Sequence, residues 1–152
     1  MSIVQPTTFI LWGKKFEEAP TTTFVTELRQ AGLKVKIVGL DGRQTSGANG
    51  LALVPDMTLS RALMLVQQAS CVILPCDAPR LRWCVTDPRV RRFLADARAG
   101  NALFVVSQAW AEATEATIAS FLNATSFMVY PGCNDLVAFA RELADSLNAI
   151  RN

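Results

Sequence analysis

Short apolar segments alternate with amphipathic segments along the chain, and this alternation limits the fold more than any other feature. The apolar segments have the length of strands and end at Gly, Pro or polar residues; they are 8–12, 33–40, 51–54, 71–74, 102–106 and 126–130. The amphipathic segments have helical spacing; they are 21–31, 58–68, a stretch capped by Asp87 and ended by Gly100, 108–122, and a last one capped by Asn134 or Asp135. Buried strands between amphipathic helices indicate a parallel sheet covered on both faces. We therefore expect a three-layer α/β/α sandwich with a doubly wound, mostly parallel sheet.

No repeat, linker or low-complexity segment interrupts this pattern in the 152 residues, so we expect residues 1–152 to form a single domain. In open parallel sheets, ligands bind outside the carboxyl ends of the strands. In this chain those ends are the segments 13–20, 75–79, 107–109 and 131–134. We expect a functional site at this rim of the sheet.

The chain contains no histidine, and this absence excludes several large classes of enzyme chemistry. It excludes Ser-His and Cys-His catalytic pairs, imidazole metal ligands and a histidine pH switch. The four cysteines are Cys71, Cys76, Cys84 and Cys133, and none of them forms a C-x-x-C pair. A zinc site made of cysteine alone stays open, although the spacings do not match the usual zinc ribbons. We expect free thiols, no metal and no cofactor.

Charge and hydrophobicity bear on location and partners. The net charge of +2 gives no global field that would attract nucleic acid. The first residues lack the basic and apolar regions of a signal peptide, and no segment approaches the roughly 18 apolar residues that suggest a membrane span. We expect a cytoplasmic protein that binds neither nucleic acid nor membrane.

The loop after the first expected strand does not match the common nucleotide-binding motifs. It reads GKKFEEAP, which is neither the G-x-G-x-x-G of a dinucleotide site nor part of a G-x-x-x-x-G-K-[ST] phosphate loop. A phosphoacceptor domain would have acidic residues directly at the strand end, whereas Glu17 and Glu18 follow several residues later.

Five pieces of the chain, in order, resemble the ThiJ/PfpI superfamily, which is class I glutamine amidotransferase-like. They are FEEAPTTTFVTELRQAGLKVKIVGLDG, GLALVPDMTLSRA, CVILPCD, ALFVVSQAW and YPGCNDLVAFARELADSL. They correspond to the superfamily's paired-glutamate loop with its helix and strand, its V-x-P-D strand, its V-x-L-P-G-G strand end, its A-x-C-x-G nucleophile turn, and its closing glycine loop and helix. The resemblance implies a flavodoxin-like fold and a homodimer.

The departures from the superfamily pattern fall on its chemistry. Active members use a cysteine on a strained strand-to-helix turn, a nearby glutamate that lowers the pKa of that cysteine or shares its proton, and backbone amides that form an oxyanion pocket. Here Ser107 stands in the cysteine position, Pro20 in that of the glutamate, Cys76 and Asp77 in place of the double glycine, and Ala109 in place of the following glycine. A serine hydroxyl is a poor nucleophile without an adjacent base, so we interpret the site as catalytically inactive.

Several residues stay candidates for the rim, each with a structural alternative. Ser107 is either a nucleophile or a small polar residue in an inactive pocket. Cys76 and Cys133 are either relocated reactive thiols or ordinary ones, with the carboxylate of Asp77 expected to raise the pKa of Cys76. The resemblance suggests that Glu17 and Glu18 line the pocket, and both also suit the start of a helix. The candidate site is therefore Ser107 with a pocket formed by Glu17, Glu18, Cys76, Asp77, Gln108 and Cys133.

We expect a non-catalytic ThiJ/PfpI-like domain that binds a small ligand or a protein at this rim. The alternative is an enzyme of the hydrolase or glyoxalase/deglycase type that uses Ser107, Cys76 or Cys133.

Overall fold

The central feature of the computed structural model is a six-stranded sheet, within a description that covers residues 5–42, 44–111 and 126–151. Its strands lie in the order β5-β2-β1-β6-β7-β8, and every neighbouring pair is parallel. The strands are β1 (Thr7–Trp12), β2 (Lys34–Gly39), β5 (Met57–Thr58), β6 (Ala69–Leu74), β7 (Leu103–Ser107) and β8 (Phe127–Tyr130). The expected doubly wound parallel sheet is confirmed.

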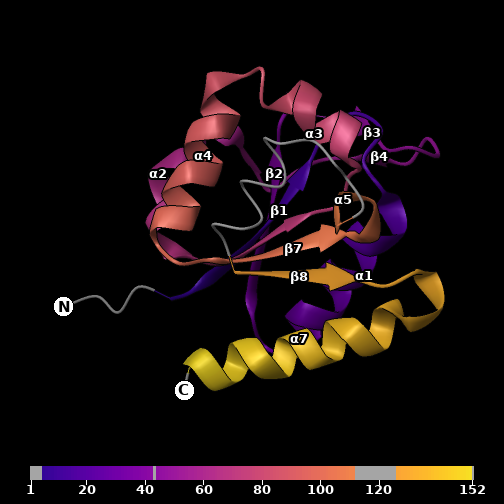
Figure 1. The fold of residues 1–152 in the computed structure, drawn as a ribbon, viewed down its shortest axis with the longest axis vertical. Helices are drawn as coiled ribbons and strands as arrows, with labels where there is room; N and C mark the ends of the chain where they lie inside the picture. The colour runs from indigo at the N-terminus through magenta and orange to yellow at the C-terminus, as the bar shows by residue number, and fades with distance from the viewer. Residues whose placement is uncertain (1–4, 43, 112–125, 152) are drawn as a thin grey trace.

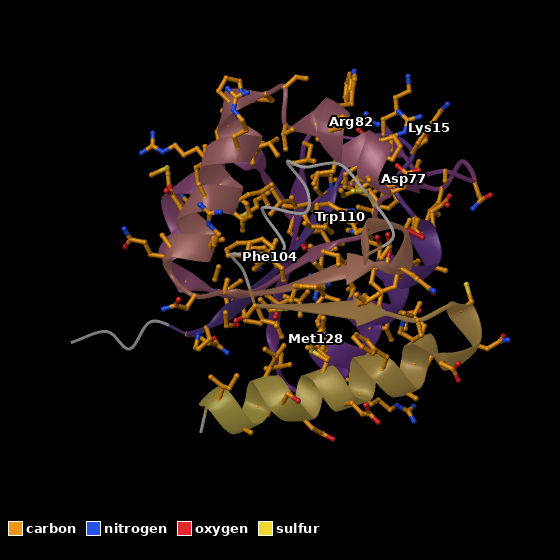
Figure 2. The ribbon with its side chains drawn as sticks, in the orientation of Figure 1. Lys15, Asp77, Arg82, Phe104, Trp110 and Met128 are labelled. Carbon is orange, nitrogen blue, oxygen red and sulfur yellow. The ribbon has the colours of Figure 1, made fainter. Side chains whose placement is uncertain are left out.

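Helices cover both faces of this sheet (Figure 1). On one face, α1 (Glu18–Gln30) packs beside α7 (Leu136–Arg151); on the other, α2 (Leu59–Leu65) packs beside α4 (Pro88–Ala99). Because successive strand residues point to opposite faces, Ile10 of β1 joins the core under α1 and α7, whereas Phe9 and Leu11 join the core under α2 and α4. In Figure 2, Phe104 likewise lies on the α4 side of the sheet and Met128 on the α7 side.

Short elements connect these layers. A two-stranded antiparallel hairpin, β3 (Thr45–Ser46) with β4 (Ala52–Leu53), stands apart from the main sheet. The others are the 3-10 turns η1 (Val66–Gln68) and η2 (Cys133–Asp135) and the helices α3 (Ala78–Cys84) and α5 (Gln108–Ala111). No helix in the described part of the chain is both long and apolar enough to span a membrane.

The structure corrects several boundaries of the expected elements. The first helix begins at Glu18 rather than at residue 21, and segment 51–54 contributes only the two residues of β4. The sequence pattern did not predict α3. The helix expected over 108–122 is present as α5, and its remainder lies outside the described residues.

The helix between Asp87 and Gly100 confirms the capping signals read from the sequence. The side chain of Asp87 accepts a hydrogen bond from the backbone N–H of Arg89, and Pro88 opens the helix. Gly100 follows the last residue of α4. The last helix begins at Leu136, directly after Asp135, one of the two expected capping residues, and the short turn η2 precedes it.

Candidate functional site

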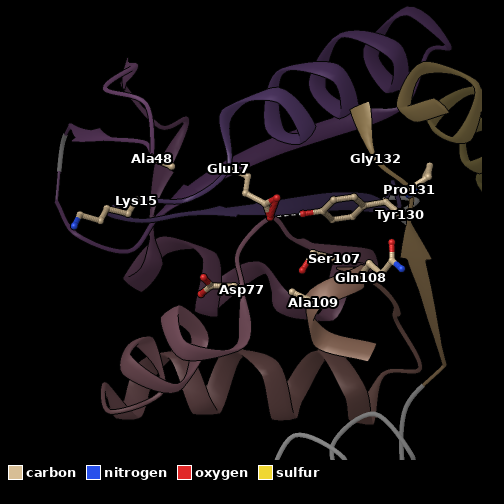
Figure 3. Close-up of a pocket in the computed structure, with 10 residues that line it drawn as sticks. All are labelled: Lys15, Glu17, Ala48, Asp77, Ser107, Gln108, Ala109, Tyr130, Pro131 and Gly132. Atoms are coloured by element: carbon tan, nitrogen blue, oxygen red, sulfur yellow. Dashed lines mark hydrogen bonds between the residues drawn. The ribbon is translucent and has the colours of Figure 1, made fainter. Parts of the chain in front are cut away.

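A cavity of about 380 Å³ lies at the carboxyl ends of β1, β6, β7 and β8 (Figure 3). The segments that the sequence placed at this rim all contribute to it, together with one residue from the β3–β4 hairpin loop. Its lining residues are Lys15, Glu17, Ala48, Asp77, Ser107, Gln108, Ala109, Tyr130, Pro131 and Gly132. The parallel topology therefore brings these segments, which are distant in sequence, to one pocket.

Glu17 and Tyr130 form the closest side-chain contact in this pocket. The hydroxyl of Tyr130 donates a hydrogen bond to Oε2 of Glu17 over 2.7 Å (Figure 3). Burial and the bound Glu17 carboxylate raise the pKa of Tyr130 well above its usual range, whereas the nearby Ser107 hydroxyl acts in the opposite direction. Tyr130 therefore stays protonated and serves as a donor to Glu17.

Ser107 is the last residue of β7, and only 5% of its surface is exposed. Its hydroxyl donates a hydrogen bond to the carbonyl oxygen of Cys76 over 3.1 Å. A carbonyl oxygen of this kind cannot act as a base. Among the described non-glycine residues, only Lys15 and Asn101 have a positive φ, so the backbone at Ser107 is not left-handed. Ser107 therefore stands at a strand-to-helix junction, as the resemblance implied, but without a left-handed backbone.

Cys76 lies beneath the pocket and does not line it. Burial raises the pKa of its thiol well above the usual value, and the negative charges of Cys84, Asp77 and Glu17 raise it further. Its carbonyl oxygen accepts hydrogen bonds from Ser107 and from the indole of Trp110, the latter over 2.9 Å. Cys76 therefore acts as a structural acceptor at the floor of the pocket, and its thiol has little tendency to ionise.

The two adjacent glutamates of the first loop have different positions. Glu18 does not line the cavity; its carboxylate accepts hydrogen bonds from the backbone N–H groups of Asn49 and Leu51 over 2.9 Å, and from the Asn49 amide over 3.0 Å. These bonds lower the pKa of Glu18, with the Leu51 contact as the largest cause. Glu18 therefore holds the hairpin loop that supplies Ala48 to the pocket wall.

The other candidates divide between the pocket and its surroundings. Gln108 lines the cavity as the first residue of α5. Asp77 lines it too, and its Oδ1 caps α3 by accepting from the N–H of Arg80 over 2.9 Å. Cys133 is exposed on η2 and lies outside the lining, although its neighbour Gly132 belongs to the lining. Trp110 is fully buried and packs below the pocket.

Sequence reasoning did not single out two polar residues of this site, Tyr130 and Lys15. Tyr130 is the only tyrosine in the chain and ends a strand directly before Pro131, so the strand-end rule could have identified it. Lys15 adopts a left-handed φ of 64°, and its N–H donates to the carbonyl of Ser46 over 3.0 Å. This turn directs its side chain away from Glu17 and Tyr130 (Figure 3). No sequence pattern signals that conformation.

The described residues contain no group of three His, Cys, Asp or Glu side chains placed to hold a metal ion.

Comparisons with known proteins give structural but not sequence relatives. No model of a protein family matches the chain. No curated protein is significantly similar to it in sequence. A DJ-1 superfamily protein from Salmonella typhimurium, solved as a cysteine-to-alanine mutant, has a TM-score of 0.76 at 18% identity, over 95% of this chain and 91% of that chain. Drosophila melanogaster DJ-1beta has a TM-score of 0.72 at 18% identity, over 94% of this chain and 90% of that chain.

A further match is part of a larger protein. A two-domain protein from Anabaena variabilis, with DJ-1/ThiJ/PfpI-like and ferritin-like domains, has a TM-score of 0.69 at 19% identity, over 95% of this chain and 48% of that chain. These likenesses show that the chain has the DJ-1/ThiJ/PfpI fold, as the sequence resemblance implied.

Proposed function

We propose that this chain, which has the DJ-1/ThiJ/PfpI fold, binds a small polar ligand in the rim pocket and does not transform it covalently. The observation that carries the proposal is the state of Ser107. The hydroxyl in the nucleophile position is 5% exposed and donates to the Cys76 carbonyl over 3.1 Å. A serine becomes nucleophilic when a base accepts its proton, and a carbonyl oxygen cannot do so.

The backbone at the pocket floor supports the same proposal. Oxyanion stabilisation needs N–H donors aimed at the position where negative charge develops. Cys76 occupies one of the positions that supply such a donor in the superfamily, yet its N–H bonds to the carbonyl of Leu74 over 2.9 Å. This donor is therefore committed within its own loop, and a tetrahedral intermediate would lack its support.

The shape of the site favours a small ligand over a protein partner. A cavity of about 380 Å³ is within the range of small-molecule sites, roughly 300–1,000 Å³. Its lining combines hydroxyl, amide and carboxylate groups with short apolar residues, which suits a ligand that forms several hydrogen bonds.

Blocking the pocket is expected to abolish ligand binding without unfolding the protein. Gly132 has a φ of −64°, and a Cβ atom at this position would meet no atom within 4 Å, so Gly132→Trp adds a large side chain at the pocket edge without strain. We expect saturation-transfer NMR against a panel of polar metabolites, namely amines, sugars, carboxylic acids and aldehydes, to give hits with the wild type that are lost in Gly132→Trp.

The same panel tests the absence of chemistry. After prolonged incubation, each hit should be recovered unchanged, and Ser107→Ala, which removes one acceptor from the pocket, should still bind the hits, at most about tenfold more weakly. Consumption of a hit by the wild type but not by Ser107→Ala would establish the enzyme alternative. Hits that persist in Gly132→Trp would show that binding occurs elsewhere.

We also propose that the chain is a homodimer built from one domain per copy, an arrangement that the superfamily resemblance implies. Sedimentation equilibrium at micromolar concentrations is expected to give twice the 16.5 kDa mass of the chain. A single species of monomer mass at all concentrations up to the millimolar range would contradict the dimer and leave the ligand proposal unaffected.

A further inference from the structure

Two hydroxyl donors at the floor of the rim pocket are already committed to protein acceptors. The hydroxyl of Tyr130 donates to Glu17 over 2.7 Å, and the hydroxyl of Ser107 donates to the Cys76 carbonyl over 3.1 Å. Each hydroxyl has one hydrogen, so what these two side chains present to a ligand is oxygen lone pairs. A ligand that contacts these two hydroxyls must therefore supply the donors.

The carboxylates of the pocket have spare acceptor capacity. Glu17 uses Oε2 for Tyr130, and its Oε1 accepts no hydrogen bond within the described part of the chain. Asp77 uses Oδ1 for the α3 cap, and its Oδ2 is likewise without a bond to any described residue. An ionised carboxylate can accept about four hydrogen bonds, so both groups can bind further donors.

Two carboxylates, those of Glu17 and Asp77, place negative charge at two separate positions in the pocket. Glu17 and Asp77 both raise the pKa of the Cys76 thiol beneath the floor, and Glu17 also raises the pKa of Tyr130 at the wall. Lys15 is the only cationic residue of the lining, and Figure 3 shows that its side chain leads away from Glu17 and Tyr130. The inner part of the cavity is therefore both negative and rich in acceptors.

We propose that the ligand of this pocket carries a primary ammonium group that binds Glu17 and Asp77, with hydroxyl groups that donate to Ser107 and Tyr130. The ligand class is a small hydroxylated amine, such as an amino polyol or amino alcohol. An ammonium group supplies three donors and a positive charge, and hydrogen bonds to charged groups are the stronger ones. This inference rests on the proposed function, because it names the ligand class of the same pocket.

Three six-carbon polyols that differ at one terminal group provide the test: glucamine has an ammonium group, sorbitol a hydroxyl and gluconate a carboxylate. Each is titrated at pH 7 into ¹⁵N-labelled protein, and the amide signals of Gln108, Ala109 and Gly132 are followed. Glucamine should shift these signals at concentrations at least tenfold below those needed for sorbitol, and gluconate should not shift them.

Isosteric variants identify the carboxylate responsible. Glu17→Gln keeps an acceptor for Tyr130 and removes the charge, and we expect it to weaken glucamine binding about tenfold. Asp77→Asn keeps the α3 cap, since asparagine is a good N-cap. It should also weaken glucamine binding. Because each variant tests the charge separately, the test still holds if one of them folds poorly. Glu142→Gln, on the exposed surface of α7, is the matched control and should bind like the wild type.

The outcomes separate this inference from the proposed function. Equal binding of sorbitol and glucamine, or preferential binding of gluconate to the helix N-termini at the rim, would overturn the ammonium inference and leave a binding pocket. A failure of all three polyols would overturn it too. The proposed function itself fails if the wider metabolite panel gives no hits that Gly132→Trp removes, or if the wild type consumes a hit that Ser107→Ala leaves unchanged.

Discussion

Replacing Trp110 by alanine is expected to lower the free energy of unfolding by about 3–5 kcal/mol, the range for removing a large buried aromatic side chain. Trp110 is fully buried in the core between the sheet and the α2–α4 layer. Its indole N–H also donates to the Cys76 carbonyl over 2.9 Å, directly under the pocket floor. Urea denaturation followed by circular dichroism measures the change.

Two further variants separate volume from hydrogen bonding at this position. Trp110→Phe keeps most of the ring volume and loses the indole donor, so we expect a loss of about 1–2 kcal/mol. Trp83 is 58% exposed, and Trp83→Ala should cost less than about 0.5 kcal/mol. A loss in Trp110→Ala no larger than that in Trp83→Ala would contradict the packing described for this core.

Raising the pH above about 9 is expected to destabilise the protein by several kcal/mol. Burial raises the pKa of Cys71 from 9.0 to about 12 and that of Cys84 to about 11, and the pKa values of Cys76 and Tyr130 are also raised. Between its unfolded and folded pKa values, each such group keeps its proton only in the folded state. The unfolded state therefore binds fewer protons, and stability falls as the pH rises.

The contribution of each group is full below its unfolded pKa and is lost as the pH approaches the folded value, at up to about 1.4 kcal/mol per pH unit. Urea denaturation at pH 8, 9.5 and 10.5 measures the decline. Cys71→Ala removes one titrating group and should make the decline shallower, whatever its effect at pH 8. The exposed Cys133 provides the control, since Cys133→Ser should leave the slope unchanged. Equal stability at all three pH values would contradict the burial of these thiols.

The layered fold could be predicted because the signals for it are local and repeated. Apolar runs such as that of β6 and capping pairs such as Asp87 with Pro88 depend on neighbouring residues alone. The helix α3 was missed because its seven residues include Pro79 and lie between two stronger signals. The expected strand at 51–54 was reduced to β4 because it pairs with β3 rather than with the main sheet.

The rim could also be predicted, since the carboxyl ends of parallel strands meet there whatever their sequence. The different positions of the Glu17 and Glu18 carboxylates could not be predicted from the sequence. Glu17 is the N-cap residue with an extended backbone and Glu18 is the first residue of α1, so one carboxylate meets Tyr130 and the other meets the hairpin loop. Which one faces the pocket depends on the helix beginning at Glu18, three residues before the predicted start. The Glu17–Tyr130 contact joins residues 113 positions apart, which no local pattern reveals.

The ordinary backbone at Ser107 has an evolutionary consequence. Substituting a cysteine there would supply a thiol but leave the position almost fully buried and its backbone outside the left-handed region. It would also not restore a carboxylate in place of Pro20, which is buried in the first turn of α1, or release the Cys76 N–H from Leu74. Thiol chemistry at this position thus needs several substitutions together. Under the proposed function, single mutations therefore offer no gradual route to a reactive thiol in this pocket.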